Sequence, residues 1–309
     1  MKPAVLILGA TGTIGRGTVH AAVEAGWPVV AVARDSDALE QLRLQYPQAQ
    51  LRTVVGSVAD DTSAAALVAE LRKLNRSFLG VVAALGTGRE RGRLMDQESS
   101  RLRDSFDEAV VPHLAAARHL LPWLAETGRN CGYVVIGGPG GRYPWAGYGH
   151  RSIAAAALQM LARVLHSEAR QFSVRLQLLE VESPVRTDAN EKHACQQWPC
   201  VSHIGRKALA LLKHRNEPRC TEAVVDYRSE ACGGQSELSD VGPTADRIVE
   251  STPTHSSPPA QDETAGAAPQ EMDSDASLLP ARCLQDVRKL LETFTPSKNP
   301  TKKNQERTK

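Results

Sequence analysis

The chain is poor in aromatic residues and has no marked charge imbalance. Phe, Trp and Tyr make up 4% of its 309 residues, and the formal net charge is +2. No basic block falls on an expected helix face, so the charge pattern gives no indication of nucleic-acid binding. No run of about 18 apolar residues occurs, which excludes a membrane-spanning helix. No signal-peptide pattern precedes the first expected strand at residue 4, and this indicates a cytoplasmic protein.

The cysteines also lack the spacing of a closed metal or redox motif. The chain has six cysteines and no C-x-x-C pair, so we expect scattered reduced thiols. His193, Cys195, Cys200 and His203 are ligand types that suit zinc, but their spacing matches no closed zinc motif. We therefore interpret this cluster as incidental and expect no metal site.

A glycine-rich turn follows a short apolar run at the start of the chain. Residues 4–8 are all apolar, and Gly9-Ala10-Thr11-Gly12-Thr13-Ile14-Gly15 comes next, followed by apolar residues at helical spacing. Glycines let a backbone approach a pyrophosphate, and the N–H groups that begin the next helix face its charge. A glycine-rich turn in another kind of α/β protein is the alternative. We predict a dinucleotide site with contacts from Gly9, Thr11, Gly12, Thr13, Ile14 and Gly15.

The end of the second expected strand bears on the choice of cofactor. Residues 28–33 form this strand, and they end about twenty residues after the glycine turn, where the fold recognises the adenosine ribose. Ala33 stands where an NAD-binding chain carries a carboxylate, and Arg34 suits a 2′-phosphate. The pattern predicts NADP. NAD stays open, because Asp35 takes the ribose role if the strand ends one residue later.

Strands and helices alternate over residues 1–228, which we predict to be a single Rossmann-type domain. The alternation is typical of an α/β protein with a doubly wound parallel sheet. Near-continuous apolar runs suit parallel strands that are covered on both faces. The expected strands are 4–8, 28–33, 51–55, 78–85, 133–136, 174–181 and 222–227. The expected helices are 14–25, 64–74, 99–125 with an interruption near Pro112, 149–170 and 203–214.

The composition changes after residue 228. Gly, Ser, Thr, Pro, Asp and Glu dominate residues 229–277, which predicts a disordered linker that buries too little apolar surface to fold. Residues 278–295 carry apolar side chains at the spacing of an amphipathic helix. This helix either docks on its own domain or binds a protein partner through residues 278–294. Residues 296–309 are typical of a disordered basic terminus.

Residues 1 to about 228 resemble the short-chain dehydrogenase/reductase family. The resemblance rests on the glycine turn, on Ala33-Arg34, on Tyr148 at the head of a long alanine-rich helix, and on Ser-Pro-Val-Arg-Thr at 183–187. The family has Pro-Gly-x-Val-x-Thr at that last place, which implies that Thr187 contacts the nicotinamide carboxamide or a nearby phosphate. The resemblance implies an oxidoreductase that acts on a carbonyl/alcohol pair.

The catalytic pattern departs from that family at three positions. In the family a tyrosine transfers the proton, a lysine four residues later lowers its pKa, a serine polarises the carbonyl and an asparagine holds a water. Tyr148 fills the tyrosine position, whereas Ser152 stands for the lysine, the glycines within 137–141 for the serine, and Ala109 for the asparagine. Arg151 lies three residues after Tyr148 on the same helix face, and we predict it as the substitute charge.

Two functional hypotheses follow. The first is an NADP-dependent oxidoreductase with Tyr148 as proton donor and Arg151 as its charge partner. The second is a catalytically degenerate protein that binds nucleotide and acts as a regulatory or scaffolding subunit. An interaction protein without any cofactor is a weaker third hypothesis, since the glycine turn is intact.

The expected partners are a small-molecule substrate and a second copy of the chain. The helices at 99–125 and 149–170 match those through which family members often pair. Packing on their own sheet is the alternative use of their apolar faces. The candidate residues for the seam between two copies are Leu114, Leu120, Leu121, Leu124, residues 154–158, Leu161 and Leu165.

Overall fold

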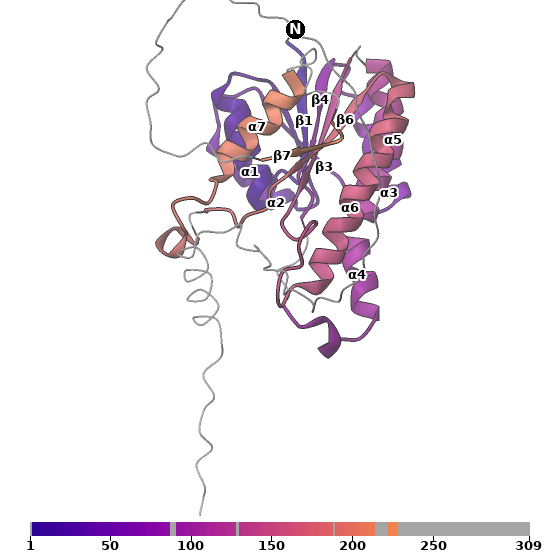
Figure 1. The fold of residues 1–309 in the computed structure, drawn as a ribbon. Helices are drawn as coiled ribbons and strands as arrows, with labels where there is room; N and C mark the ends of the chain where they lie inside the picture. Colours follow the sequence, from indigo (N-terminus) through magenta and orange to yellow (C-terminus); the bar gives the residue numbers. More distant parts are fainter. Residues whose placement is uncertain (1, 87–90, 128–129, 188, 214–221, 228–309) are drawn as a thin grey trace, which may run out of the picture. The chain divides into compact units, whose positions relative to one another are not determined.

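The protein is built on one parallel β-sheet. The computed structural model describes residues 2–86, 91–127, 130–187, 189–213 and 222–227. Seven strands lie in the order β3-β2-β1-β4-β5-β6-β7 (Figure 1), and every neighbouring pair is parallel. This order confirms the doubly wound, Rossmann-type fold. The strands are β1 (Ala4–Leu8), β2 (Val29–Ala33), β3 (Leu51–Val55), β4 (Phe78–Ala83), β5 (Gly132–Gly137), β6 (Arg175–Glu180) and β7 (Val224–Asp226).

Helices cover both faces of the sheet. In Figure 1, α1, α2 and α7 lie on one side of the strands and α3, α4, α5 and α6 on the other. Three short 3₁₀ turns complete the described elements: η1 (Leu94–Asp96), η2 (Ala169–Phe172) and η3 (Glu191–His193). The helices are α1 (Thr13–Glu24), α2 (Ser36–Gln45), α3 (Asp61–Arg72), α4 (Ser100–Ala109), α5 (Val111–Thr127), α6 (Gly149–Glu168) and α7 (Val201–Lys213).

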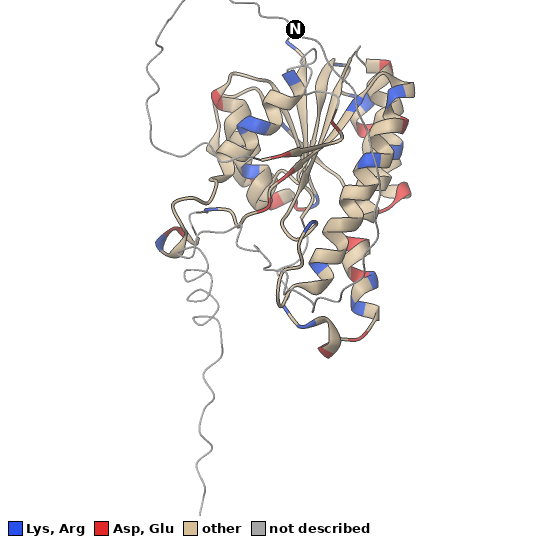
Figure 2. Cartoon of the chain, in the orientation of Figure 1, with Lys and Arg blue, Asp and Glu red and all other residues tan. Residues whose placement is uncertain are grey.

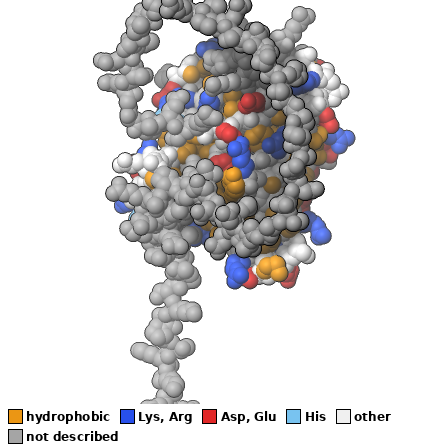
Figure 3. Space-filling view, in the orientation of Figure 1, with side chains coloured by type: hydrophobic (Ala, Val, Ile, Leu, Met, Phe, Trp, Pro, Cys, Tyr) orange, Lys and Arg blue, Asp and Glu red, His pale blue; other side chains and the backbone are white. Residues whose placement is uncertain are grey.

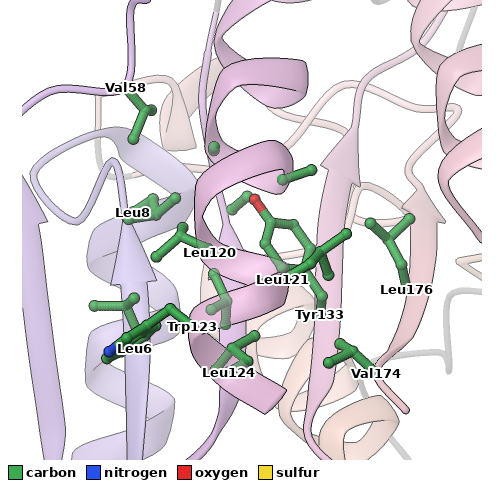
Figure 4. Packing of buried hydrophobic residues seen from close by; sticks show 14 of the residues in the cluster. Leu6, Leu8, Val58, Leu120, Leu121, Trp123, Leu124, Tyr133, Val174 and Leu176 are labelled. Carbon is green, nitrogen blue, oxygen red and sulfur yellow. The ribbon is translucent and has the colours of Figure 1, made fainter. Parts of the chain in front are cut away.

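The core consists of two apolar layers, one on each side of the sheet. Leu6 and Leu8 point into the layer under α3, α5 and α6, whereas Val5 and Ile7 point into the layer under α1 and α7. Figure 4 shows α5 placing Trp123 and its neighbouring leucines against the strands of the first layer. Because both faces are covered, β1 is buried along its whole length, as its unbroken apolar run predicts.

Two helical segments differ from the expectation. Helix α2 is absent from the predicted elements, because only Leu39 and Leu42 of its ten residues are buried, and so short an apolar stripe gives little periodic signal. The helix expected over 99–125 is two helices, which separate at Val110. The second helix starts just before Pro112, in keeping with the preference of proline for a first helical turn.

Helices α1 and α7 approach one another through two glycines. A Cβ on Gly17 would lie 2.6 Å from the Val201 carbonyl oxygen, and one on Gly205 would lie 2.7 Å from the Thr18 Cα atom. Contacts under 3.0 Å require the backbone to move, so the two helices can pack this closely only with glycine at both positions. Helix α7 therefore fixes the position of α1, whose first turn belongs to the candidate site.

The surface mixes charge of both signs with apolar side chains. Where side chains are coloured, Figure 3 shows basic, acidic and hydrophobic groups next to one another. Within the described ranges, no helix combines the length and the apolar character that a membrane crossing requires. The segments 229–277, 278–295 and 296–309 lie outside the described residues.

Candidate cofactor and catalytic site

The candidate site lies at the carboxyl ends of the central strands. Strand β1 runs between β2 and β4, and the chain leaves it toward α1 at Gly9. The Ala84 N–H, just past the end of β4, donates a hydrogen bond to the Leu8 carbonyl oxygen at 3.1 Å. In doubly wound sheets, ligands bind outside this edge at the point where the strand order reverses. The fold therefore brings the glycine turn to the expected place.

The glycines of the turn are required by close backbone contacts. Gly9 has φ +69°, and a Cβ there would lie 2.3 Å from the Ala84 carbonyl oxygen. A Cβ on Gly15 would lie 2.0 Å from the Gly9 carbonyl oxygen. The Gly12 N–H donates to that same oxygen at 3.0 Å and closes the turn. Side chains at Gly9 and Gly15 would push the turn open, so this tight shape depends on glycine.

The residues present fit a dinucleotide pyrophosphate. Gly12 is the N-cap of α1 and forms no side-chain cap, and Gly12 and Thr13 are exposed. The first N–H groups of a helix have no acceptor within the helix, and the helix dipole adds positive potential there. Thr11 is held by the Arg16 side chain, whose Nε donates to the Thr11 carbonyl oxygen at 2.9 Å. Ile14 packs against the apolar layer under α1.

Asp35 is engaged as a helix cap. Its Oδ1 accepts the backbone N–H groups of Asp37 at 2.9 Å and Ala38 at 3.0 Å, which begin α2. Strand β2 ends at Ala33, so the strand does not extend the extra residue that the ribose role of Asp35 requires. Arg34 therefore lies exposed at the carboxyl end of β2, and its contact with a 2′-phosphate stays a prediction.

Two guanidinium groups lie near the ring of Tyr148. This tyrosine is the N-cap of α6 and is half-buried. The guanidinium carbon of Arg151 lies 5.8 Å from its ring centroid, and that of Arg91 lies 5.6 Å away. The ring of Trp145 meets it edge-on with centroids 5.9 Å apart. The structure thus brings Arg151 to Tyr148 as the sequence predicts, and adds Arg91 from the loop after β4.

The position that the resemblance assigns to the lysine is closed. Ser152 is buried, and its Oγ accepts the Trp145 N–H at 2.9 Å. A Cβ on Gly140, which has φ +101°, would lie 2.8 Å from that Oγ. The glycine-rich loop after β5 therefore packs directly on the first turn of α6. Any cation that acts on Tyr148 must come from another position, such as Arg151.

A buried carboxyl group lies under the same loop. Glu180, the last residue of β6, is 1% exposed, and a Cβ on Gly141 would lie 3.2 Å from its Oε1. Burial raises the pKa of Glu180 to about 7, and the acidic neighbours Glu182 and Asp226 act in the same direction. Arg142 opposes this shift in pKa from 3.0 Å and also pairs with Asp226. One guanidinium thus ties the loop to the ends of two strands.

Thr187 lies in a turn that Asn190 stabilises. The Asn190 Oδ1 accepts the Thr187 N–H at 2.7 Å, and its Nδ2 donates to the Val185 carbonyl oxygen at 2.9 Å. Arg186 pairs with Cys200 through an isolated β-bridge, which fastens the start of this loop to the residue before α7. These contacts hold the backbone around Thr187, and its nicotinamide role stays a prediction.

Sequence reasoning missed Arg91 and Glu180. Arg91 sits in a loop whose course the strand pattern does not define, so its approach to Tyr148 has no local signal. Glu180 does have a local signal, since an acidic residue that ends an apolar strand is seldom buried without a reason.

Among the described residues, no three or more His, Cys, Asp and Glu side chains are grouped so that they could hold a metal ion.

The comparisons with known proteins identify the family. Residues 3–197 match the sequence profile of the short chain dehydrogenases. The match covers more than half of the chain, which therefore belongs to the short chain dehydrogenase family. Membership makes it an oxidoreductase-family protein, with a nicotinamide nucleotide as the cofactor class of this site.

Individual relatives agree with this assignment. The sulfoacetaldehyde reductase of Chromohalobacter salexigens is 29% identical over 154 residues, which are 48% of this chain and 58% of the relative. The chain thus matches little more than half the length of that protein. A short-chain dehydrogenase from Streptomyces avermitilis is 25% identical with a TM-score of 0.60, over 75% of this chain and 90% of that one.

One solved structure that shares the fold contains a bound cofactor. It is an NADPH-bound short chain oxidoreductase from Pseudomonas aeruginosa PAO1, whose name says that it contains an atypical catalytic center. It is 19% identical with a TM-score of 0.61, over 72% of this chain and 94% of that one. At this identity the likeness concerns the fold.

Proposed function

We propose that the protein is an NADP-dependent oxidoreductase that interconverts a small carbonyl compound and its alcohol. The observation that carries the proposal is the placement of Tyr148, with Arg151 beside it, at the head of α6 on the sheet edge that holds the glycine turn. This arrangement supports the proposal, because a tyrosine hydroxyl that can donate a proton lies on the same edge as the proposed cofactor site.

The chain offers contacts along the whole length of a dinucleotide. The turn and the first helical residues would bind the pyrophosphate, Arg34 the 2′-phosphate, and Thr187 the nicotinamide end. When bound, the nicotinamide supplies or takes up a hydride. The residues in these roles are Gly9, Thr11, Gly12, Thr13, Ile14, Gly15, Arg34 and Thr187.

Tyr148 and Arg151 would supply the proton chemistry. In the reducing direction, the Tyr148 hydroxyl donates its proton to the carbonyl oxygen as the carbonyl carbon becomes an alcohol carbon. Arg151 would supply the positive charge beside the ring during this transfer. In the oxidising direction the phenolate takes the proton back.

The substrate class is suggested by the relative. Its name describes a reductase of sulfoacetaldehyde, an aldehyde that also carries a sulfonate. This supports a carbonyl substrate for the present chain, and a panel that tests turnover should contain charged as well as neutral aldehydes and ketones.

The choice of cofactor is tested with Arg34→Ala. Wild-type protein is titrated with NADPH and with NADH, and we expect tighter binding of NADPH. Loss of a charge-assisted hydrogen bond, worth about 1.5–3 kcal/mol, should weaken NADPH binding roughly 10- to 100-fold. NADH binding should stay unchanged. Arg43→Ala, which removes an ion pair with Glu40 on α2, is the control and should alter neither affinity. Equal loss of both cofactors would contradict the assignment to the 2′-phosphate.

A second candidate is a nucleotide-binding subunit without turnover. The residue at the family's lysine position favours this candidate. Ser152 stands there, buried under Gly140, so the lysine on which the family's tyrosine depends is missing. NADPH binding without reduction of any carbonyl in the panel would support this candidate. Binding together with turnover would exclude it.

We also propose that two copies of the chain pair through α5 and α6. Leu120, Leu121 and Leu124 pack against their own sheet, so they do not form the seam. Instead, Leu114 on α5 is 46% exposed and Met160 on α6 is 58% exposed. A cavity of about 420 Å³ opens beside Leu114 and is lined by residues of both helices, including Val111 and Leu165. Apolar side chains exposed together on two helices suit a self-complementary contact.

Leu114→Glu tests the pairing. Wild-type protein should show twice the monomer mass of 33.4 kDa by light scattering at micromolar concentration. A buried charge at the seam should shift Leu114→Glu to the monomer. Leu44→Glu is the matched control, because Leu44 is 63% exposed on α2, away from the seam, and should leave the dimer intact. A monomeric wild type would end the proposal.

A further inference from the structure

A cluster of carboxyl groups lies where the loop between β5 and α6 (residues 138–148) meets the ends of β6 and β7. Leu176 and Leu178 point from β6 into the layer under α6, and by alternation Glu180 points the same way. In Figure 2, charged residues are spread over the outer helices, and red segments at the centre of the view mark acidic residues on β6 and β7. A carboxyl group in an apolar layer needs either a partner or a proton.

Glu180 has few partners for a carboxylate. It is 1% exposed, and the guanidinium of Arg142 lies 3.0 Å from its Oε2 as an ion pair. Among the described residues, no donor forms a hydrogen bond with either carboxyl oxygen of Glu180 or with Oε1 of Glu182. The Glu182 carboxyl group lies within hydrogen-bonding reach of Glu180. Two facing carboxyl groups satisfy one another only with a proton between them, so this pair is suited to hold one proton.

The charged groups around Glu180 act on its pKa in opposite directions. Burial raises the pKa most, Glu182 and Asp226 raise it further, and Arg142 lowers it. Gln159, which reaches the loop from α6, carries no charge. The balance raises the pKa of Glu180 from 4.5 to about 7. The closed loop therefore binds the proton more tightly than an open loop, in which the carboxyl group would have its ordinary pKa.

The β5–α6 loop connects this cluster to Tyr148. A Cβ on Gly141 would lie 2.3 Å from the Gln159 Nε2 and 3.2 Å from the Glu180 Oε1, so the loop backbone lies directly on both side chains. Further along the same loop, the Trp145 carbonyl oxygen accepts the Tyr148 N–H at 3.0 Å. A movement of the loop away from Glu180 therefore displaces the backbone that holds Tyr148.

We propose that Glu180 is a positioning residue for Tyr148: its protonated carboxyl group bonds Glu182 and keeps the loop closed, and loss of that proton loosens the loop. This inference rests on the proposed function, since Tyr148 is the proton donor named there. When Glu180 ionises, one guanidinium, that of Arg142, is left to offset three carboxylates, those of Glu180, Glu182 and Asp226. The closed loop is thus favoured at mildly acidic pH and weakened as the pH rises through about 7.

Hydrogen exchange of residues 138–148, measured by mass spectrometry at pH 6 and pH 8.5, tests the inference without turnover. After correction for the intrinsic effect of pH on exchange, a shift in pKa from 4.5 to about 7 predicts that wild-type protection falls about tenfold. Glu180→Gln, whose amide stays neutral and can donate to Glu182, should keep at pH 8.5 the protection that it has at pH 6. Glu222→Gln is the matched control, because Glu222 is exposed just before β7, and it should show the wild-type fall.

Two further substitutions should move the transition in opposite directions. Arg142→Gln removes the cation that lowers the pKa of Glu180, so the fall in protection should occur at higher pH. Glu182→Gln removes a like charge and supplies an amide donor, so the fall should occur at lower pH. A side chain that only fills space would give neither shift, and these variants keep the test valid if Glu180→Gln does not fold.

Turnover is the second measurement. Wild-type kcat/KM should fall at least about threefold between pH 6 and pH 8.5, and this fall should be smaller in Glu180→Gln. A fall in protection that persists in Glu180→Gln, or that neither Arg142→Gln nor Glu182→Gln moves, overturns the inference. Turnover without any loop transition also overturns it and leaves the oxidoreductase intact. A loop transition that disappears in Glu180→Gln supports the hold of this carboxyl group on the loop even if no carbonyl compound is reduced.

Discussion

Tyr148→Phe is expected to abolish carbonyl reduction while leaving NADPH binding intact. The substitution removes one hydroxyl and retains the ring that contacts Arg91, Arg151 and Trp145. Proton transfer by a positioned side chain contributes about 10²–10⁴-fold to rate, so kcat should fall by at least about 10²-fold. The measurement is NADPH oxidation with the best carbonyl of the panel, together with a fluorescence titration of the cofactor.

Tyr143→Phe is the control for this experiment. Tyr143 lies in the same loop, five residues earlier, and is 62% exposed. The same removal of a hydroxyl there should change neither kcat nor cofactor affinity. Full turnover by Tyr148→Phe would show that another group transfers the proton, and the proposed role of Tyr148 would have to be abandoned.

Gly15→Ala is expected to eliminate cofactor binding. The new Cβ would stand 2.0 Å from the Gly9 carbonyl oxygen, so the backbone of the turn must move. Overpacking of this kind costs about 1–3 kcal/mol of stability. The pyrophosphate contacts depend on the same backbone atoms, and we expect NADPH affinity to drop at least about 100-fold, which corresponds to about 3 kcal/mol. Titration with NADPH and thermal unfolding of the same sample measure both effects.

Gly26→Ala makes the same chemical change at the other end of α1. Gly26 has φ +63°, and a Cβ added there would have no heavy atom within 4 Å, so alanine is strained but not crowded. We expect it to cost about 1 kcal/mol of stability and to leave NADPH affinity unchanged. If Gly15→Ala binds NADPH as tightly as wild type, the glycine turn is not the phosphate site.

Much of the fold is predictable because the strands of a covered parallel sheet are continuous apolar runs. β1, which is buried throughout, has the predicted bounds, and β4, also buried throughout, ends two residues earlier than predicted, at Ala83. β3 has the predicted bounds too, although it is only partly buried. Polar helices give a weaker signal, and α2 was not predicted because only two of its residues, both leucines, are buried. The division between α4 and α5 is predicted only as an interruption near Pro112. Local pattern thus predicts elements well where burial is complete on both faces.

The candidate site is only partly predictable, because its contacts join distant parts of the chain. The glycine turn and Arg151 lie next to their partners in sequence, and the local pattern finds both. Arg91 reaches Tyr148 through a backbone bridge that no sequence spacing encodes. His113, a buried residue of α5, is a second example of an environment that local sequence does not indicate: burial lowers its pKa to about 4, although a hydrogen bond with the Leu85 backbone acts in the opposite direction. Such features depend on tertiary packing.

The contact between α1 and α7 links two parts of the site mechanically. The bridge between Arg186 and Cys200 joins the two ends of the loop that lies between them. Val201, the next residue and the first of α7, packs against Gly17 of α1. The loop that follows β6 is therefore anchored to α1, the helix whose first turn is the proposed pyrophosphate site. The backbones of α1 and α7 touch at Gly17 and Gly205, so there is no flexible side chain between them that could absorb a displacement. We expect a displacement of one helix to move the other as a rigid body. We therefore expect the glycine turn and the loop from Arg186 to Cys200 to move together and not independently.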